Sequence, residues 1–587
     1  MRYYGVCAVN PSHANLAGFS EIWLGDFEFY QPPGERPKPI CLVATEFKTG
    51  VSYRQAEPFP RIPPFGQGAD SLFVSYYAPA ELECYLALGW RLPYNILDLF
   101  AEFRLYRSGL GSMCGFNLLG ALAHFGVGGI GSVEKQSMQE LAARGGPFTD
   151  SEMTALVNYC ETDVVGLKRL LPAMAQQLDF PRCLIRGEYT KAVADIEFRG
   201  IPVDVTRFRA LLDNWEQIKT RVIREVDANY GVFDGLTFKA ARWESFLQKH
   251  NIPWPRLPSG SLALGDDTFK EMARAYPIVS PIREARRTLS QLRLNEFGIG
   301  SDGRHRCMLS PFASQTGRNQ PSTSRFIFSS PKWLRNLIYP AEGRALAYID
   351  YEQQEFGIAA ALSGDEKMLL AYESGDPYLQ FAIRVGGVPA NATKQTHARE
   401  RELFKACALG VQYGMQAESL ALRINSSPAH GRQLVDLHRR SFPKYWAWSD
   451  NVQDSAMFSG KLTATFGWQV NVGPAPNPRS LRNFPLQANG AEMLRWACIL
   501  CRERGVNVCA PVHDALLIES DADHINEAII TCQKAMADAS AVVLAGFRLR
   551  TGSKIIARDN RFDEPKGNEM WTKICRALAD CNEGKLS

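Results

Sequence analysis

The chain has 587 residues, a net charge of +4, and a composition of 45% hydrophobic and 22% charged residues. This length allows several domains, and this balance is typical of globular proteins and excludes an intrinsically disordered chain. No run of about 18 apolar residues marks a membrane span, and the first residues, MRYYGVCAVNPSH, lack the basic and apolar segments of a secretory signal. We therefore expect a cytoplasmic protein without a membrane partner.

Residues 1–185 alternate short apolar runs with helical patterns, which predicts an α/β domain. In WLGDFEFY, Asp26 and Glu28 are two positions apart on an expected strand, so both carboxylates emerge on one face. In NYCETDVVGLKRL, Tyr159 and Asp163 are one helical turn apart and approach one point together. Two such acids are more often plain surface residues, but paired carboxylates on one face otherwise indicate a bound cation.

Residues 186–300 are mostly helical and charged, which suits an arm that grips a ligand. Strand and helix signals mix again in 301–365 and 479–587, while 366–478 form a largely helical insertion. The stretch 283–344 is rich in arginine with few acids. It is either a solvated face or the local basic patch that a nucleic-acid binder of small net charge requires.

Two aspartates follow strand-like runs in the second half of the chain. In ALAYIDYEQQEFGIAAAL, Asp350 lies where an alternating strand pattern gives way to a helical one. In CAPVHDALLIES, two apolar runs flank His513 and Asp514, which predicts a tight hairpin with Asp514 at its tip. A single aspartate of this kind is usually a turn or cap residue. Two on neighbouring strands would bring two carboxylates to one point, as metal-assisted phosphoryl transfer requires.

A helical segment between these aspartates carries distinctive side chains at four-residue spacing. They are Arg401, Lys405, Leu409 and Tyr413 in RELFKACALGVQYG. On an α-helix this spacing forms one stripe roughly 18 Å long. Two cations followed by an apolar and an aromatic residue suit a ligand that is anionic at one end and flat at the other. A nucleoside triphosphate has this form, so the pattern indicates a polymerase.

Three ordered segments resemble the polymerase motifs of family A DNA polymerases, the bacterial DNA polymerase I family. They are DYEQQE from Asp350, R-x3-K-x3-L-x3-YG from Arg401, and VHD ending at Asp514. TGR at 316–318 and NFPLQANGAE at 483–492 resemble further family elements. The resemblance implies a multidomain α/β and α+β fold, with a ribonuclease H-like 3′–5′ exonuclease domain before a right-hand polymerase. The expected domains are 1–185 for the exonuclease, 186–300 for the thumb, 301–365 and 479–587 for the palm, and 366–478 for the fingers.

The resemblance also implies roles for single residues. Asp350 and Asp514 would be catalytic and hold two Mg²⁺ ions per active site, for which Mn²⁺ is expected to substitute. Glu355 would limit the room at the 2′ position of the sugar. The expected nucleotide-binding residues are Arg401, Lys405, Leu409, Tyr413, Glu355, Gln353 and Tyr378. The expected contacts with primer–template DNA are Arg318, Arg479, Asn483, Gln487 and His513.

In the first domain, the pattern resembles a two-metal proofreading exonuclease. The metal ligands would be Asp26, Glu28, Glu81 and Asp163, and the catalytic Tyr159 would orient the attacking water. The middle acid has two candidates. Glu81 in VSYYAPAELE is preferred because it lies on a helical run, and Asp98 in NILDLF is the competitor.

Three positions depart from the family pattern. Ala515 stands where a second acid usually follows the aspartate, Leu409 where an aromatic ring is usual, and Tyr378 where a histidine is common. Two acids remain for polymerase catalysis. The missing ring predicts altered discrimination at the incoming sugar.

The sequence thus predicts a template-directed, proofreading DNA polymerase that replicates a phage genome and acts as a monomer, in the host cytoplasm if phage-encoded. Because the chain begins with the exonuclease module, we expect no 5′-nuclease domain. The expected partners are primer–template DNA, deoxynucleoside triphosphates and replisome proteins such as a helicase, a primase and a single-strand binding protein. One alternative is a polymerase with an inactive first domain. Another is an inactive primer–template scaffold, which only the absent third acid supports.

Overall fold

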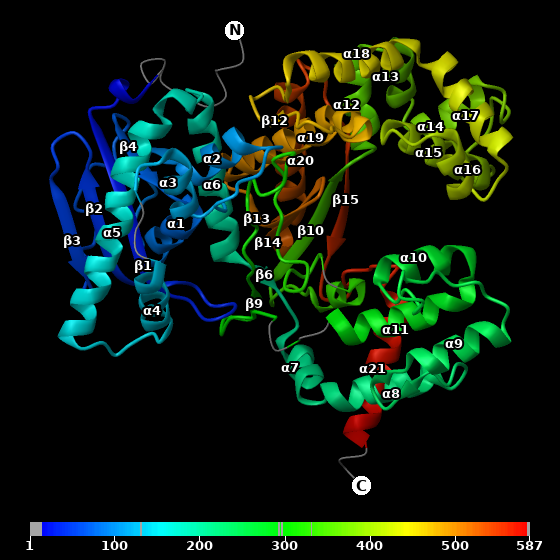
Figure 1. The fold of residues 1–587 in the computed structure, drawn as a ribbon, viewed down its shortest axis with the longest axis horizontal. Helices are drawn as coiled ribbons and strands as arrows, with labels where there is room; N and C mark the ends of the chain where they lie inside the picture. Colours follow the sequence, from blue (N-terminus) through cyan, green and yellow to red (C-terminus); the bar gives the residue numbers. More distant parts are fainter. Residues whose placement is uncertain (1–14, 129–131, 292–293, 295–296, 330, 584–587) are drawn as a thin grey trace.

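The computed structural model describes residues 15–128, 132–291, 294, 297–329 and 331–583. Figure 1 shows an N-terminal domain, residues 15–181, beside a central four-stranded sheet. A helical insertion, residues 366–471, lies at the upper right of this view, and a helical arm, residues 205–291, lies at the lower right. Within the described chain, no helix combines the length and the apolar character that crossing a bilayer would need.

The N-terminal domain is built on a five-stranded mixed sheet in the order β3-β2-β1-β4-β5. Its strands are β1 Glu21–Tyr30, β2 Lys38–Glu46, β3 Ser52–Ala56, β4 Ser71–Ser75 and β5 Asn95–Asp98. Its helices are α1 Ala78–Ala87, α2 Leu99–Arg107, α3 Leu118–Phe125, α4 Ser132–Ala143 and α5 Asp150–Met174. The first strand runs antiparallel to β2 and parallel to β4, so it forms the centre of the domain.

Helix α5 is held against the central strand of this sheet. A capping box formed by Thr149 and Glu152 starts the helix, satisfying two backbone groups that its first turn leaves open. One turn before Asp163, the Cys160 thiol donates to the Asp26 carbonyl at 3.0 Å. This contact fixes α5 along β1, where the two predicted acids of the strand lie.

Helix α6, Arg182–Arg199, connects the N-terminal domain to the rest of the molecule. It packs on α1 and β5 on one side and on α19 and β13 on the other. The Arg186 guanidinium donates to both carboxylate oxygens of Glu102 at 2.6 and 2.8 Å, and both side chains are buried. A bidentate pair of this kind fixes the helix in position.

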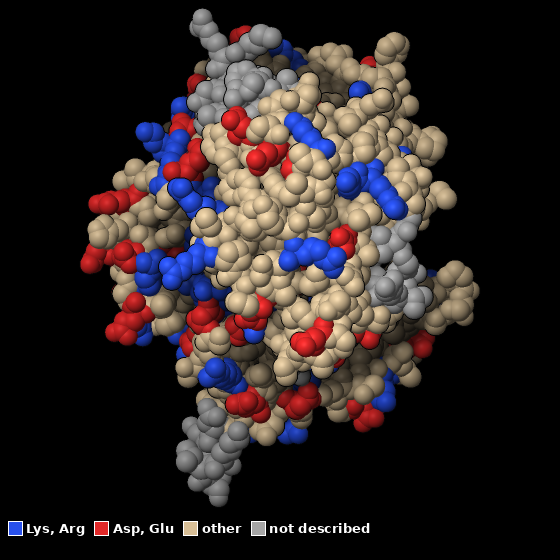
Figure 2. Space-filling model, turned by 90° about the vertical axis from the view of Figure 1, so that its left-hand side faces the viewer, with Lys and Arg blue, Asp and Glu red and all other residues tan. Residues whose placement is uncertain are grey.

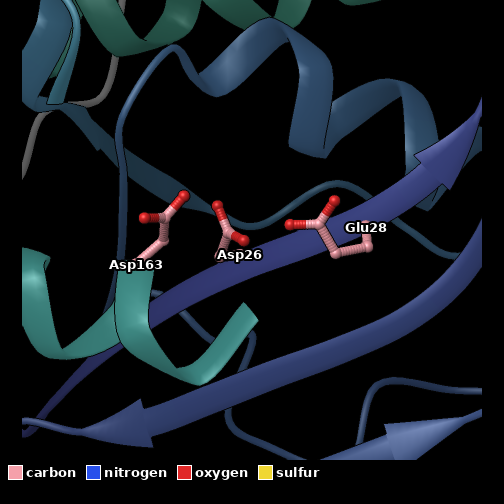
Figure 3. Close-up of side chains that lie close together, drawn as sticks. All are labelled: Asp26, Glu28 and Asp163. Carbon is pink, nitrogen blue, oxygen red and sulfur yellow. The ribbon is translucent and has the colours of Figure 1, made fainter. Parts of the chain in front are cut away.

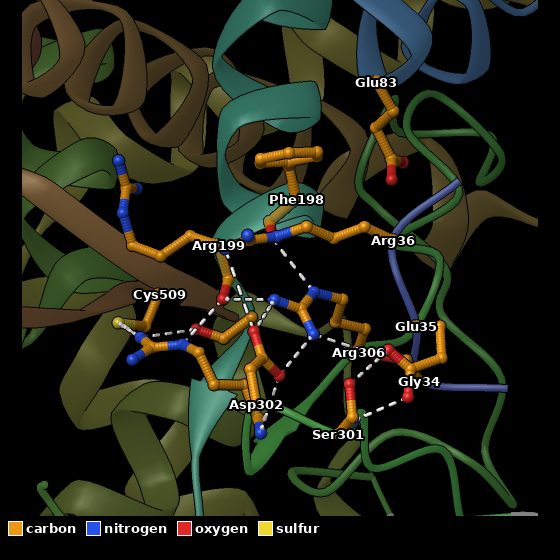
Figure 4. Close-up of polar contacts among 12 residues, drawn as sticks. Gly34, Glu35, Arg36, Glu83, Phe198, Arg199, Ser301, Asp302, Arg306 and Cys509 are labelled. Atoms are coloured by element: carbon orange, nitrogen blue, oxygen red, sulfur yellow. Dashed lines mark hydrogen bonds and ion pairs between the residues drawn. The ribbon is translucent and has the colours of Figure 1, made fainter. Parts of the chain in front are cut away.

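A loop that follows β1 docks on the segment before the central sheet (Figure 4). Arg306 donates to the carbonyls of Phe198 and Gly34 at 2.9 and 3.0 Å. The Ser301 amide and hydroxyl donate to the Glu35 carboxylate at 2.6 and 3.1 Å. The loop that directly follows the strand carrying Asp26 therefore contacts the part of the chain beyond α6.

The central sheet is antiparallel, with the order β13-β14-β10-β15. Its strands are β10 Arg344–Tyr351, β13 Asn507–Val512, β14 Ala515–Asp521 and β15 Thr551–Ile556. Helices α19 Pro478–Glu503 and α20 Ile525–Val543 pack together and cover it. The buried residues of β10, including Leu346 and Ile349, belong to the largest apolar core of the molecule.

The helical insertion follows α12, Gln354–Ser363, which begins just after β10. Its elements are α13 Glu366–Glu373, α14 Pro377–Arg384, α15 Ala398–Gln412, α16 Ala417–Arg423, α17 Pro428–Ser441, α18 Pro443–Ser459, β11 Lys461–Thr463 and β12 Gln469–Asn471. Asn471 donates through its backbone and side-chain amides to the Ser108 carbonyl, both at 2.9 Å. The terminal hairpin of the insertion therefore touches the N-terminal domain.

The helical arm has an apolar core of its own, centred on aromatic residues such as Trp243 and Phe269. Its elements are α7 Val205–Asp213, α8 Trp215–Asp227, β7 Phe233–Asp234, β8 Thr237–Phe238, α9 Ala240–Lys249, α10 Asp266–Ala275 and α11 Ser280–Gln291. The C-terminal helix α21, Asn568–Glu583, packs along α8. The end of the chain thus returns to the arm. Two short strands, β6 Ile201–Pro202 and β9 Arg304–His305, pair at its base.

Candidate active sites

Asp350 and Asp514 lie at the same end of the central sheet. Asp350 is near the end of β10 and faces Ala515 of β14. His513 and Asp514 form the two-residue turn between β13 and β14, and the Tyr351 amide donates to the Asp514 carbonyl at 3.1 Å. His513 adopts φ 55°, a left-handed conformation of the kind that such short turns require. The hairpin predicted from the sequence is therefore present, and it brings the two aspartates together.

The electrostatic surroundings of these carboxyl groups suit a bound cation. Burial raises the pKa of Asp350, and the neighbouring charge of Asp514 raises it further. Burial also raises the pKa of Asp514, against an opposing effect of Arg318. A divalent cation would remove the repulsion between the two carboxylates, and oxygen ligands of this type are those that Mg²⁺ and Mn²⁺ prefer. The residues present therefore fit such ions.

Arg318 and His513 line a cavity of about 220 Å³ beside this turn. Burial lowers the pKa of Arg318, whereas the charges of Glu355 and Asp514 act in the opposite direction. Its Nε is buried and donates to none of the described residues. Burial and the charge of Arg318 also lower the pKa of His513. A residue that lines the cavity thus has a buried donor without a partner among the described residues.

The four-residue stripe lies on α15 and at its C-terminal end. Arg401 is buried and donates to the carboxylates of Asp376 and Glu402. Lys405 is more open, with its side chain 40% exposed and its ammonium 3.8 Å from Glu402. Both cations are therefore engaged by acids in this arrangement, so an incoming anion would have to displace carboxylate partners.

The other members of the stripe differ in exposure. Leu409 is half-buried and packs against the main apolar core. Tyr413 is 39% exposed and caps the helix at its end. Tyr378 on α14 is buried and meets the edge of Phe356, with ring centroids 6.0 Å apart. Burial raises its pKa, so its hydroxyl stays protonated as a potential donor.

Glu355, Tyr413 and Gln487 form one hydrogen-bonded group, although they come from three helices. The Tyr413 hydroxyl donates to Glu355, and Gln487 Nε2 donates to the same carboxylate at 2.6 Å. Gln487 also lies on a line with two other predicted DNA contacts, Arg479 and Asn483, because the three are four residues apart on α19. Two predicted nucleotide-binding residues, Glu355 and Tyr413, thus meet one predicted DNA contact, Gln487.

Arg550, just before β15, was not predicted from the sequence. It donates to Gln353 Oε1 at 3.0 Å and to Glu352 Oε2 at 3.2 Å, and its guanidinium lies 4.2 Å from the ring centroid of Tyr372. Gln353 itself has φ 47° at the start of α12. The arginine therefore holds the turn that follows Asp350. Its isolated position in FRLRTGSK gives no periodic signal that would have identified it.

The acids of the N-terminal domain converge as well (Figure 3). Carboxylate oxygens of Asp26, Glu28 and Asp163 lie within 4.8 Å of one another. Asp26 and Glu28 come from β1 and Asp163 comes from α5. Tyr159, one turn earlier on α5, is buried, and burial followed by the charges of these acids raises its pKa. Three hard oxygen ligands at this spacing fit a divalent cation.

The two candidates for the fourth acid of this cluster lie in different surroundings. Glu81 on α1 is buried and accepts a hydrogen bond from the Phe27 amide, between Asp26 and Glu28, at 2.7 Å. Burial and then the charge of Asp26 raise its pKa. Asp98 instead caps α2, accepting from the amides of Tyr77 and Phe100 at 2.9 and 3.0 Å. Glu81 thus lies beside the cluster, whereas Asp98 caps a helix and its charge also raises the pKa of Glu81. The preference for Glu81 as the fourth acid stays a prediction.

Basic and acidic residues are interspersed over the face of the molecule in Figure 2, which includes the N-terminal domain. This mixture agrees with the small net charge of +4. A polyanion that met this face would therefore depend on local basic groups rather than on a broad basic surface.

Residues 301–554 match the family model described as DNA polymerase family A. The chain is 23% identical over 458 residues to DNA polymerase I of Aquifex aeolicus, covering 71% of this chain and 76% of that protein. It is 26% identical over 376 residues to the thermostable DNA polymerase I of Thermus thermophilus, covering 59% of this chain and 44% of that protein. It is 24% identical over 424 residues to the DNA polymerase of Mycobacterium phage D29, covering 68% and 67%.

A solved structure with a similar fold is the polymerase domain of Pol1 from M. smegmatis, determined in complex with DNA primer-template and dNTP. The TM-score is 0.70 at 18% sequence identity, and the match covers 91% of this chain and 94% of that chain. The shared fold therefore extends over the N-terminal domain as well as the residues of the family model.

Proposed function

The chain belongs to DNA polymerase family A through residues 301–554 and has the right-hand polymerase fold, and from this we propose that it extends a DNA primer along a template. The observation that supports this most directly is the meeting of Asp350 and Asp514 at the end of the central sheet. In this proposal the central sheet is the palm, the helical arm is the thumb and the helical insertion is the fingers.

The reaction would be phosphoryl transfer from a deoxynucleoside triphosphate to the primer 3′-hydroxyl. Asp350 and Asp514 would hold two divalent cations, Mg²⁺ with Mn²⁺ as a substitute, which when bound stabilise the developing charge and make the hydroxyl more acidic. Lys405 would bind the triphosphate directly. Arg401 would join it after exchanging its contacts with Asp376 and Glu402 for phosphate oxygens.

The duplex would lie against the line of residues on α19 that begins at the exposed Arg479 and continues through the half-buried Asn483 and Gln487. Arg479, Asn483 and Gln487 would contact the primer–template, together with Arg318 and His513 beside the catalytic turn. The M. smegmatis neighbour was determined with DNA primer-template and dNTP, and we extend these ligands to this chain. Contacts to the backbone and minor groove leave sequence unread, as template copying requires.

The N-terminal domain would be a 3′–5′ proofreading exonuclease. Asp26, Glu28 and Asp163 would bind divalent cations, with Glu81 beside them, and the Tyr159 hydroxyl would orient the attacking water. The convergence of three carboxylates from β1 and α5 supports this activity.

The biological setting we propose is replication of a phage genome by a monomer in the host cytoplasm, together with replisome proteins. The DNA polymerase of Mycobacterium phage D29 is matched over about two thirds of both chains, which supports this setting.

Primer extension tests the proposed polymerase activity. Wild type should add nucleotides to a primed template in Mg²⁺, and Asp350→Ala and Asp514→Ala should each abolish addition. A wild type that adds none, or fully active variants, would refute the assignment. For the nuclease, Asp26→Ala should stop degradation of a 3′-labelled single strand without affecting extension, and unchanged degradation would refute that site.

A further inference from the structure

The residues that pair with Asp350 on its two neighbouring strands carry no carboxylate. Across the three strands, Ala515 of β14, Asp350 of β10 and Gly552 of β15 face one another. Directly facing residues of antiparallel strands project from the same face of a sheet. Ala515 has no functional group, and Gly552 has no side chain, so Asp350 is the single carboxylate in this row.

Glu352 reaches the same face from two positions further along the chain. Its amide donates to the Arg550 carbonyl at 2.9 Å, which continues the pairing of β10 with β15 beyond the last strand residue. A Cβ at Gly552 would lie 3.2 Å from Asp350 Oδ1 and 3.7 Å from Glu352 Oε1. Both carboxylates thus lie close to the same glycine, which leaves room for them because it lacks a side chain.

The two oxygens of Glu352 are in different surroundings. Oε2 accepts a hydrogen bond from Arg550 Nε at 3.2 Å, and Arg550 is itself held by Gln353 and the Tyr372 carbonyl. Oε1 accepts no hydrogen bond from the described residues and is the carboxylate oxygen of Glu352 that lies close to the Gly552 position. The arginine therefore fixes the carboxylate with one oxygen left for another partner. The charge of Glu352 also contributes to the raised pKa of Asp350.

We propose that Glu352 supplies the third carboxylate of the polymerase centre, in place of the acid that Ala515 does not provide. Glu352 acts on the cations held by Asp350 and Asp514, by contributing negative charge and an oxygen ligand, directly or through a bound water. Arg550 positions it. This inference rests on the proposed polymerase function.

The test measures metal binding apart from catalysis. Free Mn²⁺ is followed by electron paramagnetic resonance while the full chain is titrated, in an Asp26→Ala, Asp163→Ala background that removes acids of the other cluster. Glu352→Gln keeps the size of the side chain and an acceptor for Arg550 but removes the charge. We expect it to weaken Mn²⁺ binding about tenfold and to raise the Mg²⁺ concentration required for half-maximal primer extension. Glu352→Asp, which retains the charge, should lie between Glu352→Gln and wild type.

Glu342→Gln is the matched control. Glu342 precedes the first residue of β10, its side chain is 93% exposed, and its carboxylate lies 3.5 Å from the guanidinium of Arg558. It should behave as wild type in both measurements. If Glu352→Gln lowers only the melting temperature and leaves Mn²⁺ binding and the Mg²⁺ requirement unchanged, Glu352 is merely a salt-bridge partner and the inference fails. If wild type extends no primer, the proposed function fails instead, whatever the Mn²⁺ titration gives.

Discussion

Gln487 of α19 donates a hydrogen bond to Glu355 of α12 at 2.6 Å, so the helices that precede and follow the insertion share one carboxylate. The Tyr413 hydroxyl at the end of α15 donates to the same group. Burial and this hydrogen bond raise the pKa of Tyr413, which keeps the hydroxyl protonated as a donor. Glu355 is therefore held from two sides at the place where the family resemblance puts the sugar of the incoming nucleotide.

Glu355→Ala should weaken discrimination against ribonucleotides. Removing the carboxylate opens space for a 2′-hydroxyl and releases Tyr413 and Gln487 from their common partner. We expect the kcat/KM for a ribonucleotide relative to its deoxynucleotide to rise about 10- to 100-fold in single-nucleotide addition. Glu366→Ala, at an exposed glutamate of the insertion, is the control, and an unchanged ratio for Glu355→Ala would place the sugar elsewhere.

Leu409→Tyr should change the use of 2′,3′-dideoxynucleotides. Leu409 is half-buried in the stripe between Lys405 and Tyr413, so its side chain would lie beside the incoming sugar. A tyrosine hydroxyl there could replace a hydrogen bond lost with the 3′-hydroxyl, whereas Leu409→Phe adds the ring alone. We expect greater dideoxynucleotide incorporation by Leu409→Tyr than by Leu409→Phe in a chain-termination assay. Equal selectivity in both variants and wild type would contradict this placement.

Local patterns in the sequence were sufficient to predict where Asp350 and Asp514 lie in the fold. The two apolar runs around His513 and Asp514 predicted a hairpin, and β13 and β14 form it. The alternation before Asp350 and the helical spacing after it predicted the change from β10 to α12. These signals are local because strand alternation and helical periodicity depend only on neighbouring residues.

Partners that are distant in sequence could not be predicted in the same way. The ion pair between Arg401 and Asp376 joins α15 to the N-cap of α14, and Arg550 donates to Glu352 across 198 positions of the sequence. Neither pair has a periodic signature. The packing of α21 on α8 is a further example, because an amphipathic C-terminal helix does not specify which apolar surface covers it.

The stability of the protein should fall as the pH rises through neutrality because of a buried carboxyl pair, Glu83 and Glu197. Burial raises the pKa of both, to about 7 for Glu197, and Glu197 accepts a hydrogen bond from Glu83 and from the Leu309 amide. Two other groups lower the pKa of Glu83: the charge of Arg306, in the segment beyond α6, and a hydrogen bond from Gln31, in the loop that follows β1. Because the folded state holds protons that the unfolded state releases above an ordinary pKa of 4.5, this contribution is largest in acid and is lost as pH passes about 7.

Glu197→Gln should therefore raise the free energy of unfolding at pH 8 by on the order of 2 kcal/mol and reduce its decrease between pH 5.5 and 8. Chemical denaturation at both pH values measures this. Glu216→Gln, at an exposed acid of the helical arm, should keep the wild-type pH dependence. A Glu197→Gln curve parallel to that of wild type would show that the pair does not titrate in this range.

Glu102→Ala should destabilise the protein strongly. Glu102 is the bidentate partner of Arg186, and both are buried where α2 meets α6. Removing the carboxylate would leave a buried guanidinium unpaired, which costs about 3–5 kcal/mol. Glu161→Ala, which breaks a half-exposed pair with Arg54, should cost less than about 1 kcal/mol. Urea denaturation of both variants measures the difference, and similar losses would contradict the role of burial.

Glu81→Gln and Asp98→Asn should affect the nuclease differently. Glu81 accepts a hydrogen bond from the amide of Phe27, the residue after Asp26. We therefore expect its substitution to lower degradation of a 3′-labelled single strand by at least about tenfold. Asparagine is as good a helix cap as aspartate, so Asp98→Asn should keep α2 in place and retain most of the activity. Both variants should extend primers at the wild-type rate, because neither residue contacts the central sheet. Loss of degradation in Asp98→Asn with full activity in Glu81→Gln would reverse the assignment of the fourth acid.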